Sequence, residues 1–498
     1  MIPEMALMKA EQWACGTVRR TKGLTSEEVS YMKSHMRSYI GGAWQRVGSS
    51  FHGILLSTMR GMDQLSRRGA LGILGGAAIA GTTAIASTAL DLEWLISGAD
   101  VPGVAANLHV LLLEEIKRRA FQFFWEQACE ATGLVMDRAA TDGDEARVVS
   151  SIAATGFGLT ALCIGDARGY KPTAALKQRV IATLDFFLSV APSVNGFYYH
   201  FMDINTGAPV LDSEVSSIDT AILLCGALTC REYFQDAQIA SLATQLYNRV
   251  NWEWMLNGGP TLSQGWTRQN GMIKSRWDSY CELMMLYLLA IGSPTNPIPP
   301  SNWRAWTRPV LEYQGLKFIT ANAPLFTHQF SHAWIDFRNK RDAFANYFTN
   351  SVIATQAHKL FCLSLRPQFS DYANDFWGIS ASDSVDGYVA WGGPPVMGPI
   401  DGTVVPSAAA GSIPFLPAET IAVQQYIYKH FSTRAWTPYG FVNAFNPLTG
   451  WYDPDVIGIC QGITMLMIEN YRSEFVWKTF MKNPEINKAI ELVGFEPT

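Results

Sequence analysis

Helical periodicity runs through most of this sequence, from about Asn107 to Phe495, and it limits the folds that the chain can adopt. Apolar residues recur there at three- and four-residue spacing, which places them on one face of a helix. Strand-like alternation is rare, and 194–203 is the best candidate for a small β-hairpin. The pattern therefore predicts an all-α protein. Its clearest helices are expected at 112–128, 149–169, 175–190, 217–234, 241–256 and 461–481.

The helical region is long enough for one large domain, expected to span 107–498. Of the 498 residues in the chain, 48% are hydrophobic, so a sizeable core can be buried. No change in composition marks a linker, even in the Gly- and Pro-rich stretch 392–417. About 390 residues of paired helices suit a closed ring of helical hairpins, an (α/α)6 barrel or toroid whose long loops form a cleft. Two smaller helical bundles are the alternative.

A targeting segment is expected at 59–89. Arg67 and Arg68 precede a charge-free run of Gly, Ala, Leu and Ile, and the small residues 84–86 follow as a cleavage-site pattern. These features predict a twin-arginine export signal and a periplasmic or secreted protein. The alternative is an anchor formed by the uncleaved signal, although a run of about 18 Gly- and Ala-rich residues is marginal for spanning a bilayer.

The position of this signal also bears on the start of translation. An export signal belongs at the beginning of a chain, yet about 65 residues precede this one. Residues 1–58 hold no domain pattern, so we expect them to be a mispredicted, disordered extension. Met59 or Met62 would place the twin arginines where a signal needs them.

Charge and cysteine content exclude several classes of protein. The net charge is −5, and no cluster of Lys and Arg suits a nucleic-acid backbone. Eight cysteines are scattered without a CxxC motif, so buried free thiols are favoured over a disulfide framework or a zinc site. The protein is therefore expected to bind neither nucleic acid nor a metal, and no other cofactor is expected. We also expect a monomer, a prediction that does not rest on the charge or the cysteines.

Aromatic and polar residues gather in the loops between the predicted helices. The chain has 16 Trp, 18 Tyr and 26 Phe, more than packing usually requires. Carboxylates and amides hydrogen-bond sugar hydroxyl groups, while aromatic faces cover C–H patches, so these loops predict a carbohydrate site. The candidate substrate-binding residues are Tyr199, His200, Glu214, Asp219, Trp266, Trp277, His328, His332, Trp377, Tyr388, Phe445 and Trp451.

Glu282 is the leading candidate for a catalytic acid, and it has a structural alternative. It precedes Leu283–Ile291, which is apolar on every face and predicts a fully buried helix. Ser279 and Glu282 have the spacing of a capping box at the start of a helix. Hydrolysis of a glycosidic bond needs two acids, one to protonate the leaving oxygen and one to activate water. The residues alone leave both roles open.

Other candidates carry similar alternatives. Asp219 either caps a helix or faces the cleft, and Asp453 and Asp455 flank Pro454 in what could be only a turn. Asp383 lies in a loop where no cap explains it. His328 and His332 share a helix face at four-residue spacing, but a hydrogen-bonded pair in the cleft is favoured over a metal site with Asp336.

Several long motifs, in order, resemble the bacterial glucoamylase-like domain family, which includes the endo-β-1,2-glucanases of glycoside hydrolase family 144. The resemblance covers about Leu111 to Phe495. It is carried by 214-EVSSIDTAILLCGAL-228, 280-YCELMMLYLLAIGSPTNPI-298, 326-FTHQFSHAWIDFR-338, 376-FWGISASDSVDGY-388 and the segment 440–484. The resemblance implies an (α/α)6 barrel and an inverting glycoside hydrolase that acts on β-1,2-glucan.

The resemblance also implies roles for individual residues. Glu282 matches the glutamate of the family's Tyr-Asn-Glu motif and is expected to be the general acid. The base is expected among the aspartates of the C-terminal loops, with Asp455 first, then Asp453 and Asp383. Glu214 and Asp219 match an acidic motif that contacts the substrate.

Three positions depart from the family's motifs. Cys281 replaces the Asn before the glutamate, Cys460 replaces the Asp of GIDQG, and Asn443 stands where Asp is expected in GFVDAFN. These changes leave three alternatives open beside the β-1,2-glucanase. They are a glycosidase for another linkage, a non-catalytic glucan-binding or periplasmic protein, and a polysaccharide lyase, which few clustered basic residues disfavour.

Overall fold

Helices carry most of the structure, a computed structural model that describes residues 104–498, with side chains from residue 109 onward. The predicted extension 1–58 and the predicted signal 59–89 lie outside these described residues. Within 104–498, no helix is both long and apolar enough to cross a membrane. Residues His109–Thr498 form one compact unit, and the account below concerns this unit.

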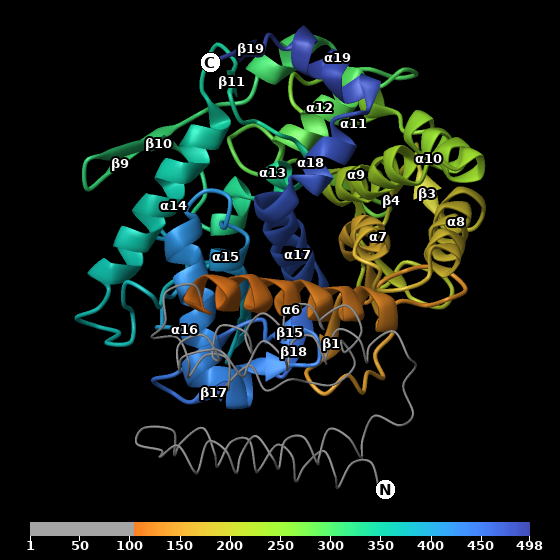
Figure 1. Cartoon of the computed structure of the whole chain (residues 1–498). Coiled ribbons are helices and arrows are strands. Elements are labelled where there is room, and N and C mark those ends of the chain that lie inside the picture. The colour runs from red at the N-terminus through yellow and green to blue at the C-terminus, as the bar shows by residue number, and fades with distance from the viewer. Residues whose placement is uncertain (1–103) are drawn as a thin grey trace, which may run out of the picture. The chain divides into compact units, whose positions relative to one another are not determined.

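The helix-rich prediction is confirmed (Figure 1). The α-helices are α6 (Val104–Glu126), α7 (Ile152–Ala167), α8 (Thr173–Ser189), α9 (Ser217–Phe234), α10 (Ala237–Asn248), α11 (Trp252–Leu256), α12 (Met284–Gly292), α13 (Phe330–Trp334), α14 (Tyr347–Ser364), α15 (Pro406–Ala410), α16 (Pro417–Ala435), α17 (Gly458–Ser473), α18 (Phe475–Phe480) and α19 (Pro484–Leu492). Two 3-10 helices join them, η1 (Pro300–Arg304) and η2 (Leu325–His328).

Two of the predicted helices are each divided into a pair. The segment 241–256 breaks between α10 and α11, where the Asn251 side chain caps the second helix by accepting from Trp254 N. The segment 461–481 breaks between α17 and α18 at Glu474, which adopts a left-handed conformation with φ of 59°. Apolar periodicity continues across both breaks, so the spacing alone did not locate them.

Short antiparallel strands are more numerous than predicted. The expected hairpin is present as β3 (Ser193–Val194) paired with β4 (Phe197–Tyr198). Pairings between distant segments include β1 (Arg138–Ala140) with β18 (Asp455–Ile457), β2 (Val149–Ser151) with β5 (Phe201–Asp203), and β6 (Val215–Ser216) with β7 (Gly265–Thr267), which also pairs with β8 (Gly271–Met272). Strands of two or three residues are too short for alternation to be recognised.

Further pairs are local hairpins or edge contacts. They are β9 (Val310–Tyr313) with β10 (Leu316–Ile319), β11 (Lys340–Arg341) with β19 (Glu496–Pro497), β12 (Ser382–Ser384) with β13 (Gly387–Val389), β14 (Trp436–Thr437) with β15 (Gly440–Phe441), and β16 (Phe445–Asn446) with β17 (Trp451–Tyr452).

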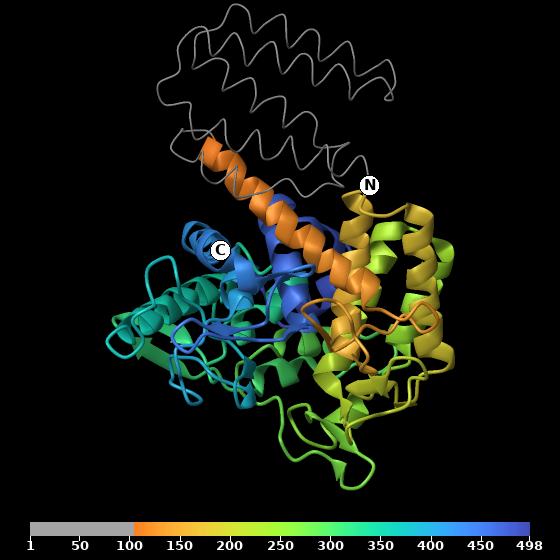
Figure 2. The ribbon, with the colours of Figure 1, turned by 90° about the horizontal axis from the view of Figure 1, so that it is seen from below.

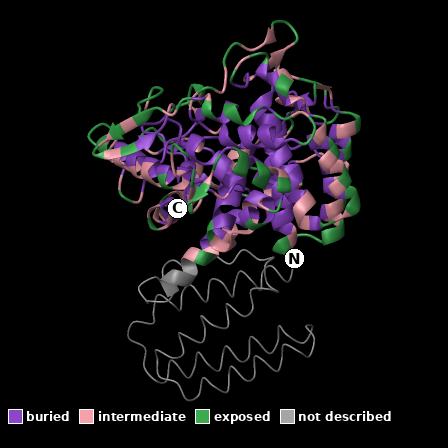
Figure 3. Ribbon diagram, turned by 90° about the horizontal axis from the view of Figure 1, so that it is seen from above, coloured by how far each residue is buried: buried purple, intermediate pink, exposed green. Residues whose placement is uncertain are grey.

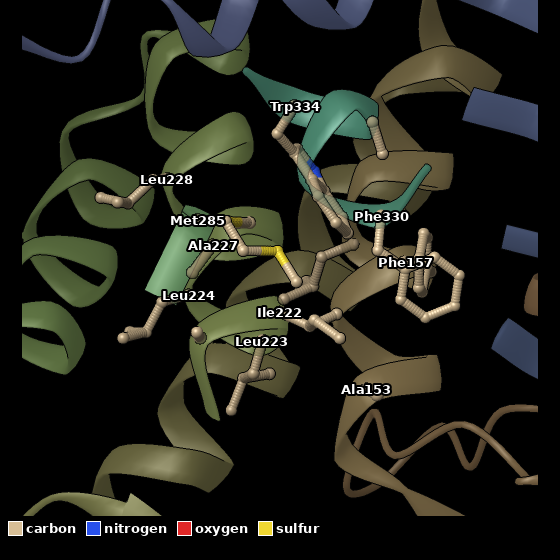
Figure 4. Close-up of a cluster of buried hydrophobic side chains, with 14 of the residues drawn as sticks. Ala153, Phe157, Ile222, Leu223, Leu224, Ala227, Leu228, Met285, Phe330 and Trp334 are labelled. Carbon is tan, nitrogen blue, oxygen red and sulfur yellow. The ribbon is translucent and has the colours of Figure 1, made fainter. Parts of the chain in front are cut away.

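The centre of the core is the contact between α7 and α9. Figure 4 shows Phe157 of α7 beside Ile222 of α9, with Trp334 of α13 above them. All three side chains are at most 2% exposed. Two glycines allow the helix backbones to approach, because a Cβ on Gly156 would lie 2.4 Å from Ile222 O and one on Gly226 would lie 2.2 Å from Gly156 O.

Helix α17 lies between α7 and α15, as Figure 1 shows, and Figure 3 shows that buried residues fill the interior of the unit. It is joined to α6 by a buried ion pair between Lys117 Nζ and Glu469 Oε2, 2.5 Å apart. In Figure 2, α6 crosses the surface of the unit above α17 and α7. Arg168, at the end of α7, also binds Glu469, so one carboxylate ties three helices together.

We expect Gly156→Ala to lower the free energy of unfolding by about 2 kcal/mol or more, because the added methyl group meets backbone atoms that cannot move aside. Chemical denaturation of the purified protein measures the change. Gly158→Ala on the same helix is the matched control, since its Cβ would meet side-chain atoms at 3.0 Å and 3.2 Å. Equal effects of the two substitutions would contradict the close-approach explanation.

Candidate active site

Glu282 lies outside the helix that follows it. Helix α12 begins at Met284, with Leu283 as its N-cap residue and no capping side chain. Ser279 is not a cap, because its hydroxyl group hydrogen-bonds Thr307 Oγ1 at 2.7 Å. The capping-box interpretation of Ser279 and Glu282 is therefore wrong, and the Glu282 carboxyl group is not needed to start the helix.

Ser331 of α13, rather than a capping box, supplies the side-chain acceptor at the start of α12. Its hydroxyl group accepts a hydrogen bond from Met285 N at 3.1 Å, which satisfies an unpaired amide of the first turn of α12. The same hydroxyl group donates to Glu282 O at 2.6 Å. The backbone of Glu282 is thus held from a neighbouring helix while its side chain stays partly exposed.

The surroundings of Glu282 favour the protonated carboxyl group. Desolvation in this apolar setting, reinforced by the negative charge of Asp219, raises the pKa of Glu282 to about 7. A hydrogen bond with the Cys281 side chain acts in the opposite direction but is outweighed. A carboxyl group that is protonated near neutral pH and still reached by solvent can donate a proton to a leaving group.

A second group of titratable residues forms at the start of α9; we call it the histidine group, consisting of His200, Glu214 and Asp219. His200 Nδ1 lies 3.1 Å from Glu214 Oε1 and 3.7 Å from Asp219 Oδ2. Burial disfavours the imidazolium, yet the charges of Asp219 and Glu214 outweigh it and raise the pKa of His200 to about 9. Ser216 donates to Asp219 Oδ2 at 2.5 Å and caps α9. Asp219 thus lies in a first helical turn and also within the site.

Aromatic residues of the predicted set lie beside the histidine group. Trp277 Nε1 donates to Ser217 Oγ at 2.8 Å, at the start of α9. Trp266 pairs with Val215 between β6 and β7. Both indole rings are partly exposed, as sugar-stacking platforms require. Tyr199 forms an isolated β-bridge with Val215, but its side chain is only 7% exposed.

The three predicted base candidates lie together; we call them the aspartate group, consisting of Asp383, Asp453 and Asp455. Carboxylate oxygens of the three lie within 4.8 Å of one another. Arg138 Nη1 binds Asp383 Oδ2 at 2.6 Å. Arg147 binds both oxygens of Asp455, each at 2.7 Å. In the sequence, these three residues are alternative candidates for the base. The structure shows that two separate loops bring them together and that two arginines bind them.

Asp453 is the member of this group that holds a proton most readily. Burial and the neighbouring charges of Asp383 and Asp455 raise the pKa of Asp453 to about 7. Asn443 Nδ2 donates to Asp453 Oδ2 at 2.9 Å. Burial and the charge of Asp455 also raise the pKa of Asp383, against the opposing charge of Arg138. The two carboxyl groups therefore affect each other's titration.

Asp137 is a site residue that the sequence reasoning missed. Its backbone is held on both sides, because Asp137 N donates to Val149 O at 3.0 Å and Gly458 N donates to Asp137 O at 2.7 Å. Its carboxylate accepts from Arg138 Nε at 3.0 Å. Its negative charge acts on His200 in one group and on Asp383 in the other. The link depends on main-chain pairing between distant segments, and no local motif signals it.

Tyr388 and Cys460 also border the aspartate group. Tyr388 is directly opposite Asp383 in the β12–β13 pair and is 54% exposed, so it is available to a ligand. Burial, with smaller contributions from the charges of Asp383 and Asp137, raises the pKa of Cys460 to about 12. The thiol that replaces the family's aspartate is therefore neutral and cannot act as a base at neutral pH.

Several predicted substrate-binding residues are interior residues instead. His328 and His332 are 4% and 0% exposed, and burial lowers the pKa of each to about 3. They contact Tyr280 OH and Ser351 Oγ, so they are not positioned to touch a sugar or to form a metal site with Asp336, which binds Arg338. Trp377 and Phe445 are also 0% exposed. Helical spacing and aromatic content did not distinguish the core from the site at these positions.

The remaining predicted platform, Trp451, is partly exposed in β17 and pairs with Asn446. It therefore stays a candidate for ligand contact at the edge of the C-terminal loops.

Either group of acids has the residue types to hold a cation, since its ligand atoms lie within 4.8 Å of one another. In the aspartate group, however, Arg138 and Arg147 already supply positive charge to Asp383 and Asp455. In the histidine group, His200 carries the positive charge itself. The protein's own cationic side chains thus offset part of the negative charge in both groups.

The chain matches one family model in part and is similar to several known proteins. Residues 274–484 match the Glycoamylase (glucoamylase) family model. The exo-β-1,2-glucooligosaccharide sophorohydrolase of Parabacteroides distasonis is 28% identical over 421 residues, which is 77% of this chain and 57% of that protein. The chain thus spans little more than half the length of that curated relative.

Two solved structures are similar in fold and sequence. The endo-β-1,2-glucanase of Chitinophaga pinensis, in complex with sophorotriose and glucose, gives a TM-score of 0.72 at 27% identity, over 78% of this chain and 98% of that one. The β-1,2-glucanase of Parabacteroides distasonis gives 0.73 at 26% identity, over 78% of this chain and 60% of that one. The resemblance found in the sequence motifs is confirmed, because residues 274–484 match the Glycoamylase family model and the chain is similar to β-1,2-glucanases of solved structure.

Proposed function

We propose that this protein is an inverting glycoside hydrolase that cleaves β-1,2-linked glucan. The observation that carries the proposal is Glu282, whose side chain is partly exposed and whose carboxyl group favours a proton near neutral pH. Its backbone carbonyl accepts a hydrogen bond from Ser331. Its setting in a chain similar to β-1,2-glucan hydrolases supports the choice of substrate.

In the proposed reaction, Glu282 gives its proton to the glycosidic oxygen as the bond to the anomeric carbon breaks. A second carboxylate removes a proton from water, which attacks the anomeric carbon from the opposite face. The negative charge of Asp219 in the histidine group disfavours ionisation of Glu282, so Glu282 keeps its proton until the bond breaks. Trp266, Trp277 and Tyr388 are the partly exposed rings that we propose as sugar platforms.

The proposal includes the finer architecture. We propose that the helices form the (α/α)6 barrel expected from the sequence, with the histidine and aspartate groups on loops at one end. The β1–β18 and β2–β5 pairings support this, because they join the loop between α6 and α7 to the loop before α9 and to the loop before α17.

A glucan-binding protein without catalysis is the second candidate. The observations that favour it are the neutral thiol of Cys460 and the amide of Asn443 at positions where the family has acids. Affinity without turnover would distinguish it from a hydrolase.

The purified protein is expected to release oligosaccharides from linear β-1,2-glucan, with the new reducing ends initially in the α configuration. Glu282→Gln should lower the rate by about 100-fold or more, because the proton donor is lost. Chromatography measures the products and early NMR spectra report the anomer. Glu312→Gln, an exposed position in β9, is the matched control and should keep wild-type activity. Binding of the glucan without products from the wild-type protein would favour the second candidate.

The activity of the wild-type protein should fall as the pH rises through about 7, because Glu282 then loses the proton that it must donate. The measurement is kcat/KM for β-1,2-glucan between pH 4 and 10 at constant ionic strength. Full activity at pH 9 would show that Glu282 is not the proton donor that limits the rate.

Glu282→Gln should also change how stability depends on pH. A carboxyl group whose pKa is higher in the folded than in the unfolded protein stabilises the fold below about pH 4.5, and this contribution is lost as the pH rises through 7. Glutamine does not titrate, so the variant should gain about 3 kcal/mol relative to wild type between pH 4.5 and 8. Urea unfolding at both pH values tests this, and an unchanged difference would contradict the raised pKa.

A further inference from the structure

We infer that Asp137, rather than a member of the aspartate group, is the carboxylate that deprotonates the attacking water. The inference rests on the proposed hydrolase activity. It starts from a simple requirement, that a general base must present an oxygen with a free lone pair to a water molecule at the site. The hydrogen-bond partners of the acids near the site show which of them meets this requirement.

The aspartate group meets it poorly. Both oxygens of Asp455 are occupied by Arg147 at 2.7 Å, in the bidentate geometry that binds a carboxylate most firmly. Asp453 accepts from Asn443 Nδ2 through one oxygen and from Asp455 N through the other. Asp383 accepts from Arg138 Nη1 through Oδ2, and burial together with the charge of Asp455 raises its pKa, which disfavours the ionised form that a base needs. Asp453 and Asp455 thus have a donor on both oxygens, and Asp383 keeps a proton more readily than an ordinary aspartate.

Asp137 has a different set of partners. One oxygen accepts from Arg138 Nε at 3.0 Å, and none of the described residues donates a hydrogen bond to the other. The side chain is 16% exposed, so water can reach it. Its backbone is fixed by Val149 and Gly458, which gives the carboxylate a defined position without using its oxygens. These are the properties of a preorganised base.

Asp137 is linked electrostatically to the part of the site that holds Glu282. The Asp137 charge acts on His200, and the Asp219 charge acts on both His200 and Glu282. The histidine group thus connects the two acids. An inverting enzyme holds its water between carboxyl groups about 6.5–9.5 Å apart.

Arg138 completes the arrangement. Its guanidinium group binds Asp137 through Nε and Asp383 through Nη1, so it fixes the two acids relative to each other. In the proposed step, water loses a proton to the free oxygen of Asp137 as its own oxygen bonds to the anomeric carbon. The bond from that carbon to the leaving oxygen breaks, and the leaving oxygen takes the proton of Glu282. One water is consumed, and each carboxyl group ends in the opposite protonation state.

Azide rescue tests the inference, because the azide anion attacks without needing a base. Asp137→Ala should hydrolyse β-1,2-glucan at least 100-fold more slowly than wild type. Adding sodium azide should restore turnover and yield an α-glucosyl azide, detected by mass spectrometry and NMR. Asp144→Asn, an exposed position in the same loop, is the matched control and should keep wild-type activity without forming azide product.

Asp137→Asn gives a second, nearly isosteric variant, and its melting temperature shows whether the fold is intact. The azide product identifies the base even when part of the sample is inactive, since it forms only where a nucleophile replaces the missing base. Activity of Asp137→Ala within threefold of wild type would overturn the inference. So would azide products from Asp383→Ala or Asp455→Ala but not from Asp137→Ala. A wild-type protein that cleaves no β-1,2-glucan would instead overturn the proposed function, before any variant is made.

Discussion

The site depends on main-chain hydrogen bonds made by the loop 136–151, which runs between α6 and α7. Strand β1 pairs with β18, so Ala140 faces Asp455, and strand β2 pairs with β5, so Ser151 faces Phe201 beside His200. The loop thereby joins the C-terminal acids to the histidine group. Such short ladders contribute little energy alone, but here they fix charged side chains that would otherwise repel one another.

The positive charges near each acid determine whether it is ionised or protonated. Arg147 keeps both oxygens of Asp455 occupied, and Arg138 spans Asp137 and Asp383. Glu282 has no cationic partner among the described residues and is desolvated, so it favours the protonated form. Environments that differ in this way separate a proton donor from proton acceptors, although the side chains are chemically alike.

The sequence predicted local features well and tertiary features poorly. Helix α9 has the predicted bounds 217–234, because its capping serine and apolar pattern are local signals. Asp137 was missed because its role comes from Val149 and Gly458, which are close only in the folded chain. His328 and His332 were placed in the cleft because residue type and spacing do not report burial, and both lie among core aromatic rings.

The substitutions at Asn443 and Cys460 are explained by the same charge balance. Asn443 donates a hydrogen bond to Asp453, where a carboxylate would add negative charge to three acids already within 4.8 Å of one another. Cys460 is neutral, so the charges of Asp383 and Asp137 are not increased by a further anion at its position. Two fewer acids at these positions reduce the repulsion that ionised carboxylates of this loop cluster experience. With Asn443 and Cys460 in place of acids, Asp137 can stay ionised beside the aspartate group.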